Sequence, residues 1–67
     1  MKSGEIYLEK SYEGSDRVLK IKLIEYLGYD LWRVHCRNAR EGSIKYYYAN
    51  ITGEDIIEYY YKIEEAS

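Results

Sequence analysis

The strongest constraint on the fold is a regular alternation of apolar and basic residues in the middle of the chain. In segment 17–27, aliphatic side chains occupy positions Leu19, Ile21 and Leu23, and lysines lie between them. In segment 31–37, Trp, Val and Cys alternate with Arg, His and Arg. Because successive side chains of a strand point to opposite faces, both segments are predicted to be strands with one buried face and one basic face.

Two further strands are expected beside this pair, at residues 5–10 and 43–49. Polar clusters that contain glycine predict the reversals between strands, and they lie at residues 13–16, 28–30 and 38–42. In the second strand the alternation doubles at Leu23-Ile24. This doubling predicts a β-bulge that turns Ile24 and Tyr26 toward the core.

The fourth of these strands carries three consecutive tyrosines. They cannot all face the core, because neighbouring side chains of a strand lie on opposite faces. We expect Ile44, Tyr46 and Tyr48 to point inward, which leaves Lys45 and Tyr47 on the outer face.

The segment that follows the fourth strand has two interpretations. Thr52 stands before Gly, Glu and Asp, which suits a helix N-cap with an acidic first turn. Ile56, Tyr60 and Ile63 then recur at helical spacing. As a strand, residues 57–63 also alternate, and Tyr and Ile both favour strands. The capping signal favours the helix.

Together these elements predict a single small α+β domain over residues 1–67, in which a four-stranded, curved antiparallel sheet is followed by a C-terminal helix (ββββα). The alternative is a small SH3-like barrel, which this order of elements also resembles. A core of this size contributes only about 3–5 kcal/mol of net stability. Burial of tyrosine rings and formation of a homodimer are the expected compensations.

The cysteine content and the apolar pattern indicate the compartment. Cys36 is the lone cysteine, so no disulfide forms within the chain, and a reducing cytoplasm is expected. No apolar region of a signal peptide follows Met1, and no apolar run approaches the ~18 residues of a membrane span. We therefore expect a cytoplasmic protein that has no membrane partner.

The net charge of −2 conceals an uneven distribution. Residues 17–45 carry seven basic and three acidic side chains, whereas residues 46–67 carry one basic and five acidic side chains. The predicted sheet is therefore basic, and the terminal element is acidic.

The outer face of the sheet is the leading candidate site. The residues expected on it are Lys20, Lys22, Arg33, His35, Arg37, Lys45 and Tyr47. Lysine and arginine neutralise phosphates, and flat rings stack on unpaired bases. These residues predict a non-enzymatic module that binds nucleic acid through the sheet.

The order of four strands and a C-terminal helix, with a basic sheet face, resembles the single-strand-binding modules related to the eukaryotic transcriptional positive cofactor four. The resemblance implies a dimer that forms through the helix and a single strand that crosses the sheet. The residues it implicates are Lys20, Lys22, Arg33, Arg37 and Lys45.

The acidic terminal element supports a different function, inhibition of a host protein by direct binding. Its acidic surface can imitate the charge of DNA, and exposed tyrosines are common in interfaces. The residues assigned to this interface are Glu54, Glu58, Tyr59, Tyr60 and Tyr61. In composition, this short, Tyr-rich and Cys-poor chain is similar to phage-encoded inhibitors, including anti-CRISPR proteins.

A third reading is a metal-dependent DNA nickase, in which loop carboxylates hold Mg²⁺. Asp16 and Asp30 are the residues it would use, with Glu13 and Glu25 nearby in the predicted loops. His35 and its neighbour Cys36 cannot ligate one metal, since they point to opposite faces of a strand. The sequence predicts no cofactor, no resident metal and no catalytic residue.

Overall fold

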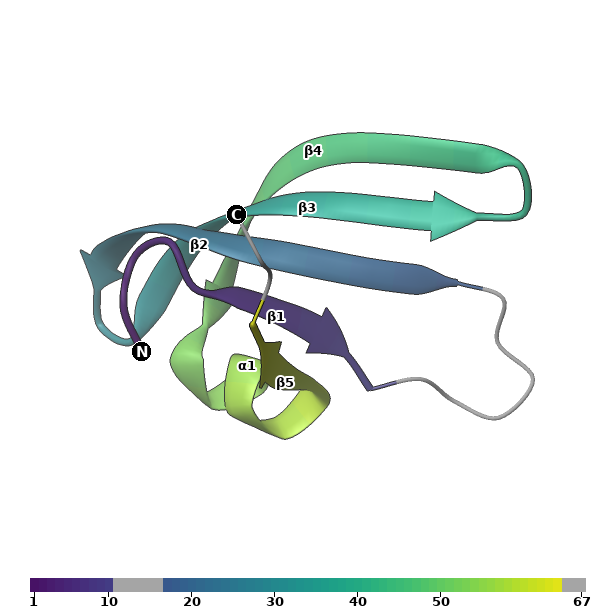
Figure 1. Ribbon diagram of the computed structural model, residues 1–67. Coiled ribbons are helices and arrows are strands. Elements are labelled where there is room, and N and C mark those ends of the chain that lie inside the picture. The colour runs from purple at the N-terminus through teal and green to yellow at the C-terminus, as the bar shows by residue number, and fades with distance from the viewer. Residues whose placement is uncertain (11–16, 65–67) are drawn as a thin grey trace.

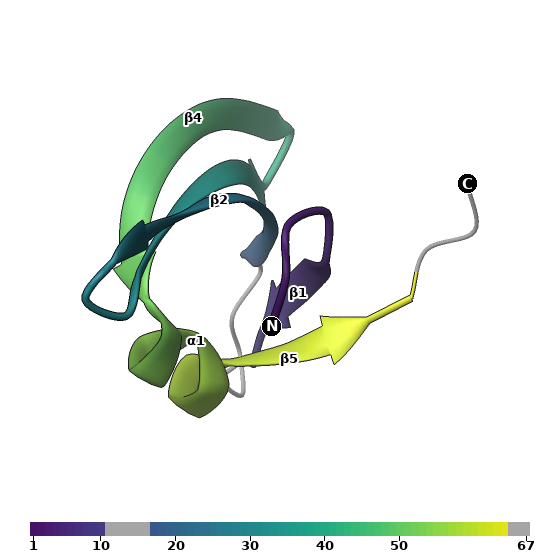
Figure 2. The same cartoon turned by 90° about the vertical axis from the view of Figure 1, so that its left-hand side faces the viewer.

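The computed structural model describes residues 1–10 and 17–64, whose strands form one curved antiparallel sheet that arches over a short helix (Figure 1, Figure 2). The elements are β1 (Ile6–Glu9), β2 (Val18–Gly28), β3 (Leu31–Arg40), β4 (Ser43–Thr52), α1 (Gly53–Tyr59) and β5 (Tyr60–Ile63). The order in the sheet is β4-β3-β2-β1-β5. The predicted fold class, an antiparallel sheet with one short C-terminal helix, is confirmed. The turn predicted at residues 13–16 lies outside the described residues.

The core lies between the concave side of the sheet and α1. The buried residues are Tyr7, Leu19, Ile21, Leu23, Trp32, Val34, Cys36, Ile56 and Tyr60. The predicted alternation in β2 and β3 is confirmed, because the core includes each of the alternating apolar residues Leu19, Ile21, Leu23, Trp32, Val34 and Cys36. Lys20 and Lys22 of β2, together with Arg33, His35 and Arg37 of β3, therefore point to the convex side.

The predicted bulge in β2 is confirmed by a register shift between Leu23 and Glu25. The shift pairs Tyr26 with buried Trp32, and their ring centroids lie 5.1 Å apart, but Tyr26 stays 54 % exposed and so reaches the face of the core without being buried in it. Ile24 does not follow it and stays 38 % exposed, so its predicted inward position is wrong. The bulge adds a residue to β2 without a partner on β3, and Ile24 is that residue.

The N-terminus of α1 is fixed by its own cap and by the turn between β2 and β3. Thr52 is the N-cap, as predicted, and its Oγ1 accepts a hydrogen bond from the Asp55 amide at 3.2 Å. Asp30 accepts from the Gly53 amide through its carbonyl and from the Glu54 amide through Oδ2. A Cβ at Gly53 would collide with the Asp30 carboxylate, so a larger residue there would have to displace this side chain.

The C-terminus of α1 is tied to the end of β1. The Lys10 side chain donates to the carbonyl oxygen of Glu58 at 2.9 Å, and its backbone amide donates to that of Tyr59. The last turn of the helix has no basic residue of its own, so Lys10 supplies the positive charge that favours a helix C-terminus. In the described residues, no helix has the length and apolar character needed to cross a membrane.

The terminal segment combines the two interpretations of the sequence. The helix ends at Tyr59, and residues Tyr60 to Ile63 form β5, which pairs with β1 from Ile6↔Ile63 to Glu9↔Tyr60. The predicted helical stripe through Tyr60 and Ile63 is therefore wrong. Pairing with the open edge of β1 satisfies backbone groups of both strands, and this tertiary contact outweighs the helical spacing.

The hairpin of β3 and β4 is tighter than predicted, and this reverses the faces of β4. Arg40 pairs with Ser43, so only two residues form the turn in place of the expected loop at 38–42. The resulting register sets Tyr47 opposite buried Cys36. The prediction that Ile44, Tyr46 and Tyr48 face the core, with Lys45 and Tyr47 outward, is therefore wrong. The first three lie on the convex side, and the last two lie on the concave side.

Glu5 connects the N-terminus, β1 and β5. Its carboxylate lies 2.9 Å from the Lys62 ammonium and accepts a hydrogen bond from the Lys2 amide at 2.8 Å. Tyr7 donates to the same carboxylate at 3.3 Å. The hydrogen bond from Lys62, followed by that from Lys2, holds the pKa of Glu5 at about 2, below its usual 4.5.

We expect this carboxylate to make stability fall in acid. Because the pKa of Glu5 is lowered by folding, its contribution is complete above pH 4.5 and is lost as the pH falls toward 2. Glu5→Gln should therefore be less stable than the parent at neutral pH, with the difference vanishing near pH 2. Urea unfolding followed by the fluorescence of buried Trp32, the single tryptophan, measures this. Glu41→Gln, in the exposed hairpin turn, is the control, and a Glu5→Gln deficit unchanged by acid would contradict the prediction.

Candidate nucleic-acid interface

The convex side of the sheet presents basic and aromatic side chains in rows that cross the strands. Residues paired directly across strands share a face, so the register defines each row. From β1 to β4, one row is Ile6, Lys22, His35 and Tyr48, and the next is Leu8, Lys20, Arg37 and Tyr46. A third row, from β2 to β4, is Glu25, Arg33 and Asn50. These eleven residues are called the convex face below.

The structure brings together five of the seven residues predicted for the interface. They are Lys20, Lys22, Arg33, His35 and Arg37. Lys45 pairs with Asn38 and Tyr47 with Cys36, so both lie on the concave side instead. Sequence reasoning missed Tyr46 and Tyr48, which take their place on the convex face. The signal that could have found them is the apolar alternation of Tyr47 with Ala49 and Ile51, which marks the core side of β4.

The aromatic residues of the convex face form a continuous cluster. The ring of His35 lies nearly parallel to that of Tyr46, with 5.9 Å between centroids and 9° between planes. The His35 ring also lies 4.9 Å from the ring of Tyr48 between centroids, with 52° between the planes. The guanidinium carbon of Arg33 lies 5.2 Å from the centroid of the Tyr48 ring. The two tyrosines are 61 % and 62 % exposed, so much of each ring remains accessible to a flat ligand.

A shallow hollow lies beside this cluster. Its volume is about 260 Å³, and it is lined by Ile6, Lys20, Ile21, Lys22, His35, Arg37 and Tyr46. The cations Lys20, Lys22 and Arg37 therefore lie beside the rings of His35 and Tyr46 on one side of the sheet. This juxtaposition of positive charge with accessible rings suits a ligand that carries both phosphates and bases.

The charge of the molecule is separated in space. The convex face has four cations and a single carboxylate, that of Glu25. Within the described parts of the chain, no carboxylate oxygen lies within 4.0 Å of the charged nitrogens of Lys22, Arg33 or Arg37. The acidic residues of α1 lie on the other side, since the helix packs under the concave side (Figure 2). The sheet therefore stands between the cations of the convex face and the acidic residues of α1.

The residues predicted for an acidic protein interface do not form one surface. Glu54, Glu58 and Tyr59 are exposed on α1. Tyr60 lies in the core, where burial raises the pKa of its hydroxyl to about 12, so its ring cannot serve an interface. Tyr61 pairs with Leu8 and points to the convex side. Only the three helical residues remain together.

The carboxylates considered for a metal site have other roles or lie outside the described residues. Asp30 holds the N-terminus of α1, Glu25 lies on the convex face, and Glu13 and Asp16 are not among the described residues. Among residues 1–10 and 17–64, no three His, Cys, Asp or Glu side chains gather as metal ligands would. Cys36 is buried, and this burial raises the pKa of its thiol.

Comparisons with protein-family models, curated proteins and solved structures give no significant match to this chain. The function is therefore argued from the geometry and charge of the convex face.

Proposed function

We propose that this protein is a non-enzymatic module that binds single-stranded nucleic acid across the convex face. The observation that carries the proposal is the cluster formed by His35 and the exposed rings of Tyr46 and Tyr48, set among four cations. Lys20, Lys22, Arg33 and Arg37 would contact phosphates, and Tyr46 and Tyr48 would stack on bases. Accessible rings favour single strands, because the bases of a duplex are already stacked on one another.

The separation of charge also supports this proposal. An acidic element beside the cations would repel phosphates, but α1 lies under the concave side of the sheet. Every residue of the convex face comes from one chain, so the expected homodimer is not required to build it. The alternative, a protein inhibitor that acts through α1, has only Glu54, Glu58 and Tyr59 as a common surface, and we rank it second.

Binding of a labelled oligothymidylate, measured by fluorescence anisotropy over a range of salt concentrations, tests the proposed function. If the four cations contact phosphates, the slope of log K against log salt should be about −3. A duplex of the same length should bind more weakly, since it offers no accessible base faces. Absence of binding to single strands at low salt would exclude the proposal.

Substitution of the two tyrosines separates the contribution of base stacking to the binding affinity from the contribution of charge. Tyr46→Ala with Tyr48→Ala should weaken binding by about 1–3 kcal/mol per base lost, while the salt slope stays unchanged. Tyr59→Ala on α1 is the matched control, because it removes an exposed ring from the opposite side of the molecule. Loss of affinity in the control alone would favour the interface on α1 instead.

A further inference from the structure

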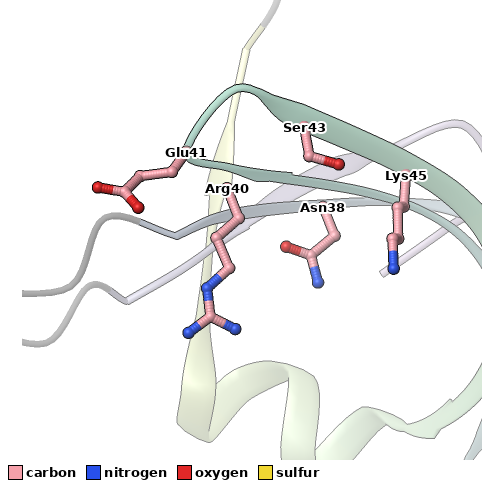
Figure 3. Close-up of a pocket in the computed structure, with 5 residues that line it drawn as sticks. All are labelled: Asn38, Arg40, Glu41, Ser43 and Lys45. Atoms are coloured by element: carbon pink, nitrogen blue, oxygen red, sulfur yellow. The ribbon is translucent and has the colours of Figure 1, made fainter.

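The concave side of the β3–β4 hairpin carries a second group of polar residues that the proposed function does not use. They line a hollow of about 390 Å³ near the hairpin turn and are Asn38, Arg40, Glu41, Ser43 and Lys45 (Figure 3). The pairs Asn38↔Lys45 and Arg40↔Ser43 put four of them on one face. This hollow lies on the side of the sheet opposite the convex face.

The side chains of this hollow present positive charge and hydrogen-bond donors to one region. In Figure 3 the guanidinium of Arg40, the amide nitrogen of Asn38 and the ammonium of Lys45 extend to the same side of the hairpin, while the carboxylate of Glu41 extends away. Within the described parts of the chain, neither Arg40 nor Lys45 has a carboxylate within 4.0 Å. Among residues 1–10 and 17–64, no aliphatic side chain lines the hollow. A compact anion is the ligand that this lining suits.

The side chain of Asn38 indicates that this ligand also carries a hydrogen-bond donor. Its Oδ1 is buried and accepts no hydrogen bond from the residues that the structure describes. A buried acceptor without a partner is costly, and it calls for a donor from water or from a ligand. A phosphate monoester supplies both kinds of group. Its oxygens accept from Arg40 and Lys45, and its second ionisation has a pKa near 6, so one oxygen carries a proton part of the time.

We propose that this hollow, the hairpin phosphate site, binds a phosphate monoester, and that its natural source is the terminal phosphate of a bound nucleic-acid strand. The choice of source rests on the proposed function. Lys45 and Tyr46 are adjacent in β4, an edge strand of the sheet, with their side chains on opposite faces. A strand that leaves the convex face at Tyr46 therefore reaches the hairpin phosphate site by passing round this edge.

Three oligothymidylates of the same length test this inference by fluorescence anisotropy: an unphosphorylated strand, a 5′-phosphorylated strand and a 3′-phosphorylated strand. The protein should bind one phosphorylated form about tenfold more tightly. Arg40→Gln with Lys45→Gln should remove this preference and leave the affinity for the unphosphorylated strand within about twofold. Arg40→Lys with Lys45→Arg should retain the preference, since the charge remains. Equal binding of all three strands by the unaltered protein would show that the terminal phosphate of a strand is not the natural ligand of this site.

Titration with inorganic phosphate, followed by amide chemical shifts, separates failure of this inference from failure of the proposed function. The amides of Arg40, Ser43 and Lys45 should shift in the parent and not in the Arg40→Gln, Lys45→Gln variant. If no oligonucleotide binds but these amides shift, the hairpin phosphate site takes free phosphate and the proposed function fails. If oligonucleotides bind without preference and the amides do not shift, the site is refuted and the proposed function stands.

Discussion

Replacing Lys22 and Arg37 by glutamate is expected to abolish binding of single-stranded nucleic acid. The two side chains lie in adjacent rows of the convex face and border the same hollow beside His35 and Tyr46. Reversal leaves Lys20 and Arg33 against three carboxylates, so the face changes from attracting to repelling phosphates. The affinity at low salt should fall by about two orders of magnitude or more, with a shallower salt slope. Anisotropy with the oligothymidylate used above measures both quantities.

Controls for this experiment are available elsewhere in the chain. Lys2→Glu changes the charge near the N-terminus, outside the rows of the convex face, and should reduce affinity only slightly. Glu54→Lys with Glu58→Lys on α1 should leave binding intact or strengthen it. If the reversal on α1 abolished binding of a protein partner while Lys22 and Arg37 proved dispensable for nucleic acid, the inhibitor function would replace the proposed one. Unchanged near-UV circular dichroism would show that the altered proteins remain folded.

The second large effect is a loss of stability when the core residue of α1, Ile56, is shortened. Ile56 is 0 % exposed, and α1 contributes no other large side chain to the core. Ile56→Ala should cost about 2–5 kcal/mol, because it removes apolar contact and leaves a cavity. The free energy of unfolding of a domain of this size is only about 3–5 kcal/mol, so this variant should be largely unfolded at room temperature. Urea unfolding followed by Trp32 fluorescence, together with circular dichroism, measures the loss.

Ile57 provides a matched control for this substitution. It is the same residue type at the next position of the same helix, but it is 68 % exposed. Ile57→Ala should therefore change the free energy of unfolding by no more than about 0.5 kcal/mol. Similar losses in the two variants would mean that α1 does not pack under the sheet with Ile56 inward.

The parts of the fold that local pattern determines were predictable from the sequence. The alternation in β2 and β3 defined both faces of the central strands, because one face had to be apolar and the other remained in water. The cap at Thr52 located the start of α1, since an N-cap and an acidic first turn depend on adjacent residues. These signals need no knowledge of distant contacts.

The errors arose where the outcome depends on pairing between strands. Asn38 and Arg40 suggested a loop, but polar residues are also compatible with a strand that has an exposed face. The hairpin is therefore longer, and its register moves Lys45 and Tyr47 off the convex face while adding Tyr46 and Tyr48. In β-structure a change of register by one residue exchanges the faces completely. For this reason the cations of the site were predicted well and its aromatic residues poorly.

The pairing of β5 with β1 has a consequence for the order in which the protein folds. β2, β3 and β4 are joined by short turns, so their hairpins can form while the chain is still being synthesised. β1 pairs on one side with β5, whose residues lie more than fifty positions later in the chain. Closing a contact of such sequence separation is slow compared with forming a hairpin. The earliest strand to be made therefore acquires its second neighbour last, and until then its open edge is exposed to any other extended chain nearby.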